Sequence, residues 1–322
     1  MGFYKRSLIN YFRQLPAITY VLIALIVIFY IFNRNFLSSM NISNIIRQGA
    51  PLIIVSLGML IVIIGGGIDL SVGALMALTG TIIALSTNAG LSLPIALILG
   101  IAVSTICGLI SGLLIGMSGL PPMIVTFGML YIAQGINLGI TGGGSMTITS
   151  KALSYFGRGA EFLGIPAVLW VVILFIVIVA LMLNRTFFGG YLYAIGTDPI
   201  GAKAMGIKVN ICVLLQYVIS GFMAGVAGVV LASRLLTGNA LVGIGTEFEA
   251  IASVVVGGTP IIGGSGTLVG TIMGALIITI LKSGLSLFGI YAGSMAIIIG
   301  LSLVIMVVLS QLLYRKEKIE KL

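Results

Sequence analysis

The stretch Ile64-Gly65-Gly66-Gly67-Ile68-Asp69-Leu70-Ser71-Val72-Gly73-Ala74-Leu75-Met76-Ala77-Leu78-Thr79-Gly80 lies between two long apolar runs. Three consecutive glycines loosen the backbone, and one carboxylate, Asp69, stands among apolar side chains. A charged residue at membrane depth costs about 2.5–3.5 kcal/mol on insertion scales, so Asp69 is a candidate functional residue. Asp69 is also placed to cap the next helix by accepting from the N–H of Ser71 or Val72. The two roles are compatible, because the backbone of a broken helix at this depth must line a cavity or lie within protein.

The composition is that of an integral membrane protein. Of the 322 residues, 59% are hydrophobic and 7% are charged, against about 25% charged residues in soluble domains. Apolar runs of about 20 residues predict helices rather than the alternating strands of a barrel. The 45 glycines suit close helix packing and broken helices. We therefore expect an all-α, polytopic protein of the lipid bilayer, with a single transmembrane domain over residues 1–322.

Apolar segments predict about ten transmembrane helices, with broken glycine-rich segments among them. They lie at about 16–32, 50–66, 70–87, 93–116, 122–140, 166–184, 211–233, 249–262, 267–287 and 292–313. Excess Lys and Arg place the N-terminus (1–15), the connector 185–210 and the tail 314–322 in the cytoplasm. The run after residue 15 is too long for a signal peptide and lacks a small-residue cleavage site, so we expect it to remain as the first helix.

Several classes of function are disfavoured by composition. The net charge of +9 does not indicate nucleic-acid binding, because the basic residues are spread over termini and loops. The absence of histidine excludes His-based catalysis and His-ligated metal sites. No Gly-Lys pair occurs, so the chain lacks a phosphate-binding loop of the Walker type. We predict no catalytic residues, no metal site and no enzymatic activity of the chain itself.

The connector 185–210 contains signals for a short helix. Asp198 followed by Pro199 is typical of an N-cap and a first helical residue, and Gly206 suits the position after the last turn. The predicted helix, 199–205, has about two turns and little amphipathic character. These properties favour docking against another protein over lying on the membrane surface.

Three further stretches admit more than one interpretation. The connector 141–165 is either solvated or a lip that meets an external partner. Glu247 and Glu249 follow Gly245 at a helix start, where they would complement the helix dipole or form a negative patch for a partner. The glycine-rich stretch 256–270 resembles the stretch around Asp69 in its spacing of glycines, which indicates an internal duplication.

Polar residues on otherwise apolar segments are candidates to line a transport path: Asp69, Ser71, Thr126, Tyr131, Gln134 and Asn137. The last three are spaced i, i+3, i+6, and we expect them roughly on one face of a helix. Gln134 and Asn137 suit hydrogen bonds between helices equally well. A secondary transporter, with Asp69 carrying a proton or binding an ion, is the alternative that these residues leave open.

The chain resembles the permease subunit of ribose-type (monosaccharide) ABC importers from about residue 36 to the last helix. The motifs that carry the resemblance are Gly67-Ile68-Asp69-Leu70-Ser71-Val72-Gly73, the stretch 189–207, Ser220-Gly221-Phe222 with Gly225 and Ala227-Gly228, and the glycine-rich stretch 249–275. This resemblance implies an ABC importer permease fold in the inner or plasma membrane of a bacterial cell. It implies ATP-driven import of a monosaccharide of the ribose, xylose or galactose type.

The resemblance also implies the partners. They are a second permease subunit, identical or paralogous, two cytoplasmic ATPase domains and an external substrate-binding protein, with ATP and Mg²⁺ bound by the ATPase and no cofactor by this chain. The short helix would be the coupling helix that enters a cleft of the ATPase, with residues Thr197, Asp198, Pro199, Ala202, Lys203 and Gly206. Two departures bear on those contacts: Gly189-Gly190 stands where the family usually has Gly-Arg, and Asp198 where it often has Asn.

Overall fold

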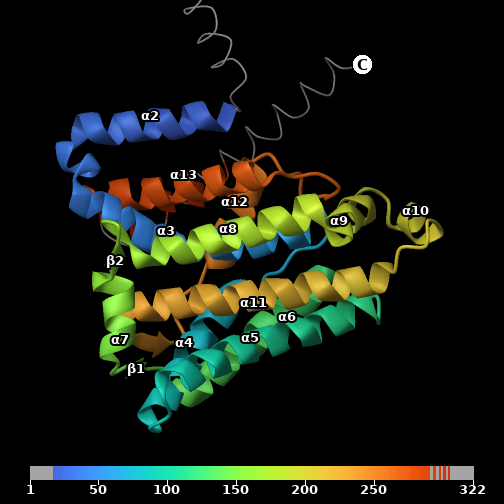
Figure 1. Ribbon diagram of the computed structural model, residues 1–322, viewed down its shortest axis with the longest axis horizontal. Coiled ribbons are helices and arrows are strands. Elements are labelled where there is room, and N and C mark those ends of the chain that lie inside the picture. Colours follow the sequence, from blue (N-terminus) through green and yellow to red (C-terminus); the bar gives the residue numbers. More distant parts are fainter. Residues whose placement is uncertain (1–16, 291–292, 295–296, 299, 302–303, 305–322) are drawn as a thin grey trace, which may run out of the picture.

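The computed structural model describes residues 17–290, 293–294, 297–298, 300–301 and 304, and it is built almost entirely of helices (Figure 1). The expected last helix, 292–313, falls largely outside these residues, and the two predicted cytoplasmic ends, 1–15 and 314–322, fall wholly outside them. The elements are α2 (Ala17–Phe32), η1 (Arg34–Leu37), α3 (Ser39–Ile64), α4 (Val72–Asn88), α5 (Leu93–Gly116), α6 (Pro122–Thr141), β1 (Ser145–Thr147), α7 (Lys151–Ser154), η2 (Tyr155–Gly159), β2 (Glu161–Phe162), β3 (Ile165–Pro166), α8 (Ala167–Arg185), α9 (Phe187–Thr197), α10 (Pro199–Ala204), α11 (Val209–Leu235), β4 (Thr237–Asn239), α12 (Thr246–Val256) and α13 (Leu268–Leu287).

Six helices of the described part are long and apolar enough to cross a membrane: α3, α5, α6, α8, α11 and α13. Apolar helices α2 and α4 are shorter. The expected span 249–262 is represented by α12, whose 11 residues cover about 16 Å of a hydrocarbon core that is about 30 Å thick. Of the ten predicted segments, six are long helices, three are the shorter helices α2, α4 and α12, and the last lies largely outside the described residues, so the count of about ten spans stays a prediction.

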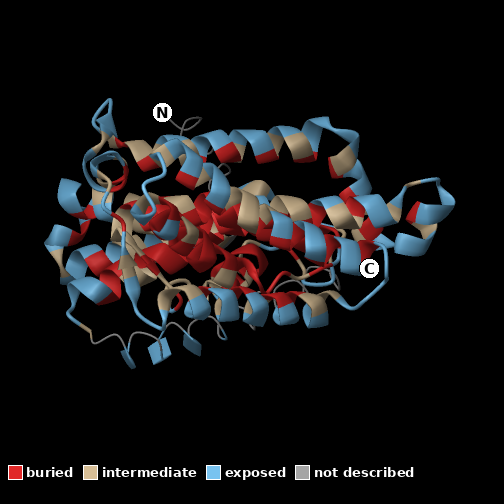
Figure 2. Cartoon of the chain, turned by 90° about the horizontal axis from the view of Figure 1, so that it is seen from below, coloured by how far each residue is buried: buried red, intermediate tan, exposed pale blue. Residues whose placement is uncertain are grey.

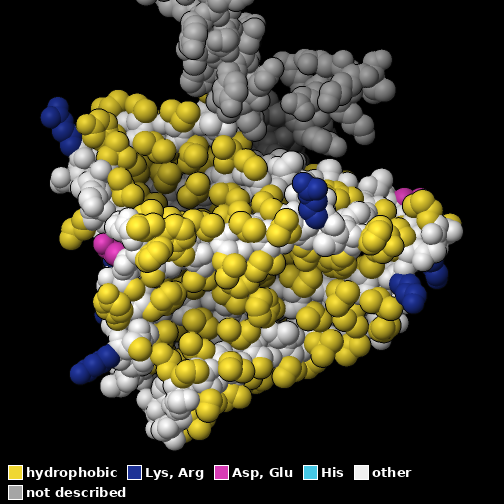
Figure 3. Space-filling model, in the orientation of Figure 1, with side chains coloured by type: hydrophobic (Ala, Val, Ile, Leu, Met, Phe, Trp, Pro, Cys, Tyr) yellow, Lys and Arg dark blue, Asp and Glu magenta, His cyan; other side chains and the backbone are white. Residues whose placement is uncertain are grey.

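The core forms around α3 and α11. In the apolar 18-residue stretch of α3, 78% of the residues are buried, against 22% in the corresponding stretches of α6 and α8. α3 packs against α8, α11, α12 and α13, and α11 packs also against α4 and α5. Buried residues accordingly fill the middle of the molecule, and exposed residues cover the peripheral helices (Figure 2). The face seen in Figure 3 is mostly apolar with few charged side chains, as a lipid-facing surface requires.

Small residues allow the helices to approach closely. Gly108, Gly112 and Gly116 recur every four residues along the face of α5 that packs on α11. A Cβ atom on Gly112 would lie 2.6 Å from the carbonyl oxygen of Leu214, so a larger residue would push the two helices apart. In lipid, such close backbone packing replaces the hydrophobic effect as the source of helix association.

The connectors gather at two ends of the bundle (Figure 1). At the end called here the β1 end, β1 pairs with β4 from Ser145↔Asn239 to Thr147↔Thr237. The Nε of Arg158 in η2 donates to the backbone carbonyl of Arg234 at 2.7 Å, which ties the connector 141–165 to the last turn of α11. At the opposite end, called here the α10 end, the connector 185–210 folds into α9 and α10. Both connectors are thus ordered parts of the fold.

Candidate functional site

Asp69 lies in the non-helical stretch 65–71 between α3 and α4, called here the first break. Its side chain is fully buried. One carboxylate oxygen, Oδ1, accepts from the backbone N–H of Ser71 at 3.0 Å and from its hydroxyl at 2.6 Å. The other, Oδ2, accepts from the hydroxyl of Ser220 on α11 at 2.7 Å. The expected bond to the N–H of Ser71 is present, but the N-cap of α4 is Ser71 and not Asp69. Asp69 in addition joins the first break to α11.

Three partners of the first break on α11 escaped prediction: Gln216, Tyr217 and Ser220, all buried. A Cβ atom on Gly65 would collide with Oε1 of Gln216, and one on Gly67 would collide with the hydroxyl of Tyr217. The triple glycine therefore makes room for polar side chains of a neighbouring helix. The sequence offered the same signal for these three residues as for Gln134, because each is a polar residue in an otherwise apolar segment.

Two of the predicted path residues on α6 face the first break and α4. Thr126 is buried, and its hydroxyl lies 3.4 Å from the carbonyl oxygen of Ile68 in the first break. Asn137 is also buried, and its Oδ1 accepts from the hydroxyl of Thr81 on α4 at 2.6 Å. In this conformation Asn137 makes the hydrogen bond between helices that the sequence offered as an alternative to a path residue.

The expectation that Tyr131, Gln134 and Asn137 share one face of a helix is wrong. Tyr131 is 60% exposed on the outer face of α6, Gln134 is half-buried at the edge, and Asn137 is fully buried. Each residue of an α-helix turns by about 100°, so positions i and i+6 end up about 120° apart. The buried face of α6 is formed instead by Thr126, Met129, Ala133 and Asn137.

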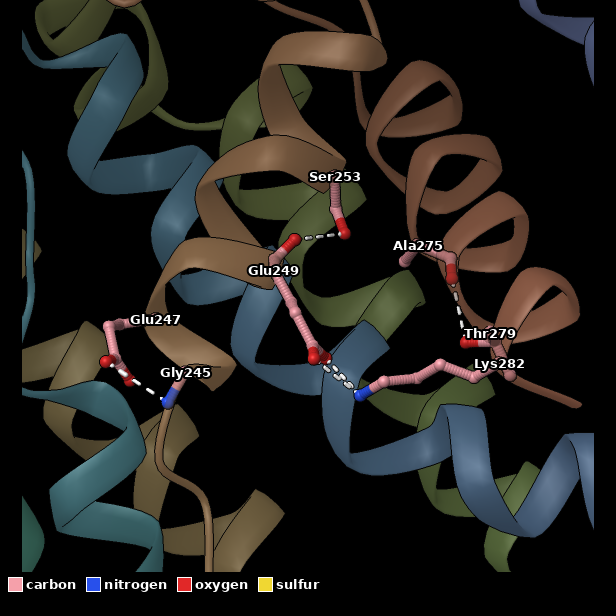
Figure 4. A network of polar contacts seen from close by, with 7 residues as sticks. All are labelled: Gly245, Glu247, Glu249, Ser253, Ala275, Thr279 and Lys282. Carbon is pink, nitrogen blue, oxygen red and sulfur yellow. Dashed lines mark hydrogen bonds and ion pairs between the residues drawn. The ribbon is translucent and has the colours of Figure 1, made fainter. Parts of the chain in front are cut away.

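A polar cavity of about 140 Å³ opens between α3, α4, α11, α12 and α13. Its charged lining residues are Arg234, Glu249 and Lys282. Nζ of Lys282 and Oε2 of Glu249 lie 2.6 Å apart, which joins α12 to α13 (Figure 4). In the same view Glu247 turns away from this ion pair and accepts from the N–H of Gly245 at 3.2 Å.

The two carboxylates therefore do not form a surface patch for a basic partner. Glu247 is buried, and the side chain of Glu249 is 15% exposed. Both lie in the first turn of α12, where negative charge complements the helix dipole. The second of the two interpretations offered by the sequence, a negative patch, is thereby corrected.

The predicted short helix is present at the α10 end as α10 (Pro199–Ala204), within one residue of the expected end. Asp198 is its N-cap and accepts from the N–H of Ile200 at 3.0 Å, with Pro199 as the first residue. Gly206 follows the last turn with φ +83°, which favours glycine. Ala202 is buried against Ile195 and Cys212, while Thr197 and Lys203 are exposed.

Behind α10, the last turn of α9 contacts a second glycine-rich stretch. Residues 257–267 connect α12 to α13 and are called here the second break. Within it, the N–H of Gly264 donates to the carbonyl of Ile64 at 2.9 Å. The hydroxyl of Tyr193 on α9 donates to the carbonyl of Gly266 at 3.0 Å. The last part of α9 is thus bonded to the second break, which is bonded in turn to the last residue of α3.

Comparison with known proteins places these features in a family. Residues 41–309 match the family described as branched-chain amino acid transport system / permease component. The chain is 38% identical over 292 residues to the ribose import permease protein RbsC of Bacillus subtilis, covering 90% of each chain. It is 31% identical over 332 residues to the galactose/methyl galactoside import permease protein MglC of Escherichia coli, covering 98% of each.

A probable ABC transporter permease protein, y4mJ of Sinorhizobium fredii, is 36% identical over 271 residues, which cover 84% of this chain and 81% of the relative. No solved structure matches the chain. The family match spans far more than half of the sequence and includes both breaks and α10. The chain therefore belongs to this family of transport permease components, and its resemblance to the ribose-type ABC permeases is confirmed.

Proposed function

We propose that this chain is the membrane-spanning subunit of an ATP-driven importer in the plasma (inner) membrane of a bacterial cell. Its solute would be a monosaccharide, of the ribose, xylose or galactose type, delivered by an external binding protein. The observation that carries the proposal is α10, a capped, projecting helix on a membrane chain whose sequence has no phosphate-binding loop. Relatives named as ribose and galactose import permeases support the class of solute.

The surface of α10 suits docking to an ATPase. The side chains of Ile200 and Met205 are 81% and 72% exposed, and Lys203 adds a positive charge. An exposed apolar pair on and directly after an N-capped helix is a surface that a protein cleft would bury. Two ATPase domains, each carrying ATP and Mg²⁺, would hold one permease subunit each, so the transporter would contain a second copy or a paralogue of this chain.

The solute path is proposed to run from the cavity at Arg234, Glu249 and Lys282 toward the first break. Both sites are polar and lie among helices that are otherwise apolar. The predicted path residues Asp69, Ser71, Thr126 and Asn137 are buried and hydrogen-bonded here, so this conformation is closed around them. In the proposal, a rigid-body movement of helices driven from α10 opens access to them. Tyr131 and Gln134 would contribute to the solute path only where the exposed side of α6 lines it.

Uptake into proteoliposomes tests the proposal. The complex purified from native membranes in mild detergent is reconstituted with its binding protein, and radiolabelled D-ribose and D-galactose serve as probes. ATP supplied on the side of the membrane that carries the ATPase domains should drive uptake of at least one probe. The double variant Ile200→Glu, Met205→Glu should abolish this uptake while it still inserts into membranes. Leu91→Glu, at an exposed apolar position in the connector between α4 and α5, is the matched control and should retain both insertion and uptake.

The alternative of an ion-coupled transporter predicts the opposite pattern. Uptake would then collapse with an uncoupler while ATP is maintained, and it would persist in a chain purified without any ATPase. Either result would contradict the proposed function. The buried carboxylate of Asp69, the reason for considering this alternative, is already occupied by three hydrogen bonds.

A further inference from the structure

The last turn of α9 meets both breaks at a junction made of main-chain atoms. Gly196, two residues before the N-cap of α10, lies directly against the last carbonyl of α3. A Cβ atom on Gly196 would fall inside the van der Waals radii of the carbonyl oxygen of Ile64 and the amide nitrogen of Gly264. No side chain fits between these three backbone segments.

The two breaks also touch each other at this junction. A Cβ atom on Gly263 would lie 2.8 Å from the Cα of Gly66, and the carbonyl of Ile64 accepts from the N–H of Gly264 at 2.9 Å. Ile64 stands five residues before Asp69 in the chain. A displacement at Ile64 therefore reaches the hydrogen bonds of Asp69 through a short piece of backbone.

Two side chains of α9 fasten the junction from the other side. The hydroxyl of Tyr193 donates to the carbonyl of Gly266, and the hydroxyl of Thr197 lies 3.4 Å from the carbonyl oxygen of Gly264. Interfaces packed this closely move as a unit or switch between discrete arrangements, because they have little free volume in which to deform. A movement of α10 must therefore carry the second break with it.

We propose that Gly196 is the positioning residue that couples α9 and α10 to both breaks, so that force applied to α10 is delivered to the backbone next to Asp69. This inference rests on the proposed function, in which an ATPase engages α10. It adds the route by which the movement enters the membrane domain. Gly196 touches no solute, and its contribution is the absence of a side chain.

The test compares Gly196→Ala with Gly190→Ala in the reconstituted complex. Both glycines lie in α9, but a Cβ atom on Gly190 meets nothing within 4 Å. ATP hydrolysis and uptake of radiolabelled D-ribose and D-galactose are measured on the same preparations. We expect Gly196→Ala to lower the ratio of solute imported to ATP hydrolysed by tenfold or more, and Gly190→Ala to leave that ratio unchanged. A wild-type ratio in Gly196→Ala would overturn the inference.

Tyr193→Phe provides a second variant in case Gly196→Ala does not assemble. It removes the bond to Gly266 without adding an atom, and we expect a two- to fivefold fall in the same ratio at unchanged complex yield. A ratio equal to wild type in Tyr193→Phe, when Gly196→Ala fails to assemble, counts against the junction. The wild-type arm separates the two proposals: without ATP-driven uptake by the wild type, the proposed function fails and the junction inference fails with it.

Discussion

The first and second breaks resemble each other in sequence and differ in how they are fixed. Each is glycine-rich, lies near the α10 end and precedes a helix, α4 or α13. The first break is held by a buried carboxylate, Asp69, whose bonds reach α11. The second break has no acidic residue and is held by main-chain contacts to Ile64 and to α9.

The difference indicates a division of roles. A buried carboxylate with three donors tolerates little rearrangement, because each unpaired group would cost about 1–3 kcal/mol. The main-chain contacts of the second break involve no buried charge, so the second break can move together with α9 without leaving a carboxylate unpaired. The helices that flank the second break are fixed elsewhere, at the ion pair of Glu249 and Lys282 (Figure 4). We therefore expect the carboxylate of the first break to contribute more to stability, and the contacts of the second break to contribute more to transmitting movement from α10.

Removing the carboxylate of the first break should have the largest effect. Asp69→Ala leaves the N–H and hydroxyl of Ser71 and the hydroxyl of Ser220 without an acceptor, at a cost of about 3 kcal/mol or more. Thermal unfolding in detergent should show a midpoint lower by about 10 °C. Thr259→Val in the second break, where the hydroxyl is buried without a hydrogen-bond partner in the described structure, is the matched control and should change the midpoint little.

Asp69→Asn sharpens the same comparison. The amide keeps the shape of the side chain and one acceptor, so most of the stability and the ATP-driven uptake should remain. Loss of uptake at a wild-type unfolding temperature would instead support proton or ion coupling through Asp69.

The ion pair that flanks the second break should come next in size. Lys282→Met leaves the carboxylate of Glu249, whose side chain is 15% exposed, without its counter-charge, and we expect a loss of about 1–3 kcal/mol. Glu249→Gln should cost less, because the side chain of Lys282 is 36% exposed and water can solvate its charge. The double variant should recover part of the loss in thermal unfolding. If the losses of stability of the two single variants simply add up in the double variant, the ion pair does not hold α12 against α13.

The contact between the second break and α9 should have a smaller effect on stability than on coupling. Gly264 and Gly258 both have positive φ, +75° and +91°, so alanine costs about 1–2 kcal/mol of backbone strain at either position. A Cβ atom on Gly264 also lies 2.6 Å from Oγ1 of Thr197, whereas one on Gly258 meets nothing within 4 Å. Solute imported per ATP should fall in Gly264→Ala and not in Gly258→Ala. Equal ratios in the two variants would contradict the comparison.

Local signals predicted local structure well. Asp198-Pro199 and Gly206 gave α10 to within one residue, because N-caps, N1 prolines and positive-φ glycines act within a single turn. The bond from Asp69 to the N–H of Ser71 was predictable because it too joins residues two positions apart, although Ser71 and not Asp69 is the N-cap of α4. The number of spans stays a prediction, because hydropathy registers apolar composition, and α12 is apolar without being long enough to cross a membrane.

Contacts between distant segments were beyond prediction. Ser220 reaches Asp69 across 151 positions of sequence, and Lys282 reaches Glu249 across 33. The pairing depends on helix rotation and depth, which a single sequence does not encode locally. Tyr131 was assigned to the face of Asn137 because the spacing i, i+6 was treated as equivalent to i, i+3. Positions i and i+3 of an α-helix differ by about 60° around the axis, and this angle doubles between i and i+6.

The smallest predicted effect isolates the bond that ties the first break to α11. Ser220→Ala removes one donor from Asp69 and should cost about 1 kcal/mol, since Oδ1 keeps both of its bonds to Ser71. Ser111→Ala is the control, because the hydroxyl of Ser111 is buried without a hydrogen-bond partner in the described structure. Thermal unfolding should place Ser220→Ala about 2–4 °C below the wild type and Ser111→Ala at or above it. If both variants unfold at the temperature of the wild type, the first break is held by packing against Gln216 and Tyr217 rather than by its carboxylate. The contrast between the two breaks then disappears.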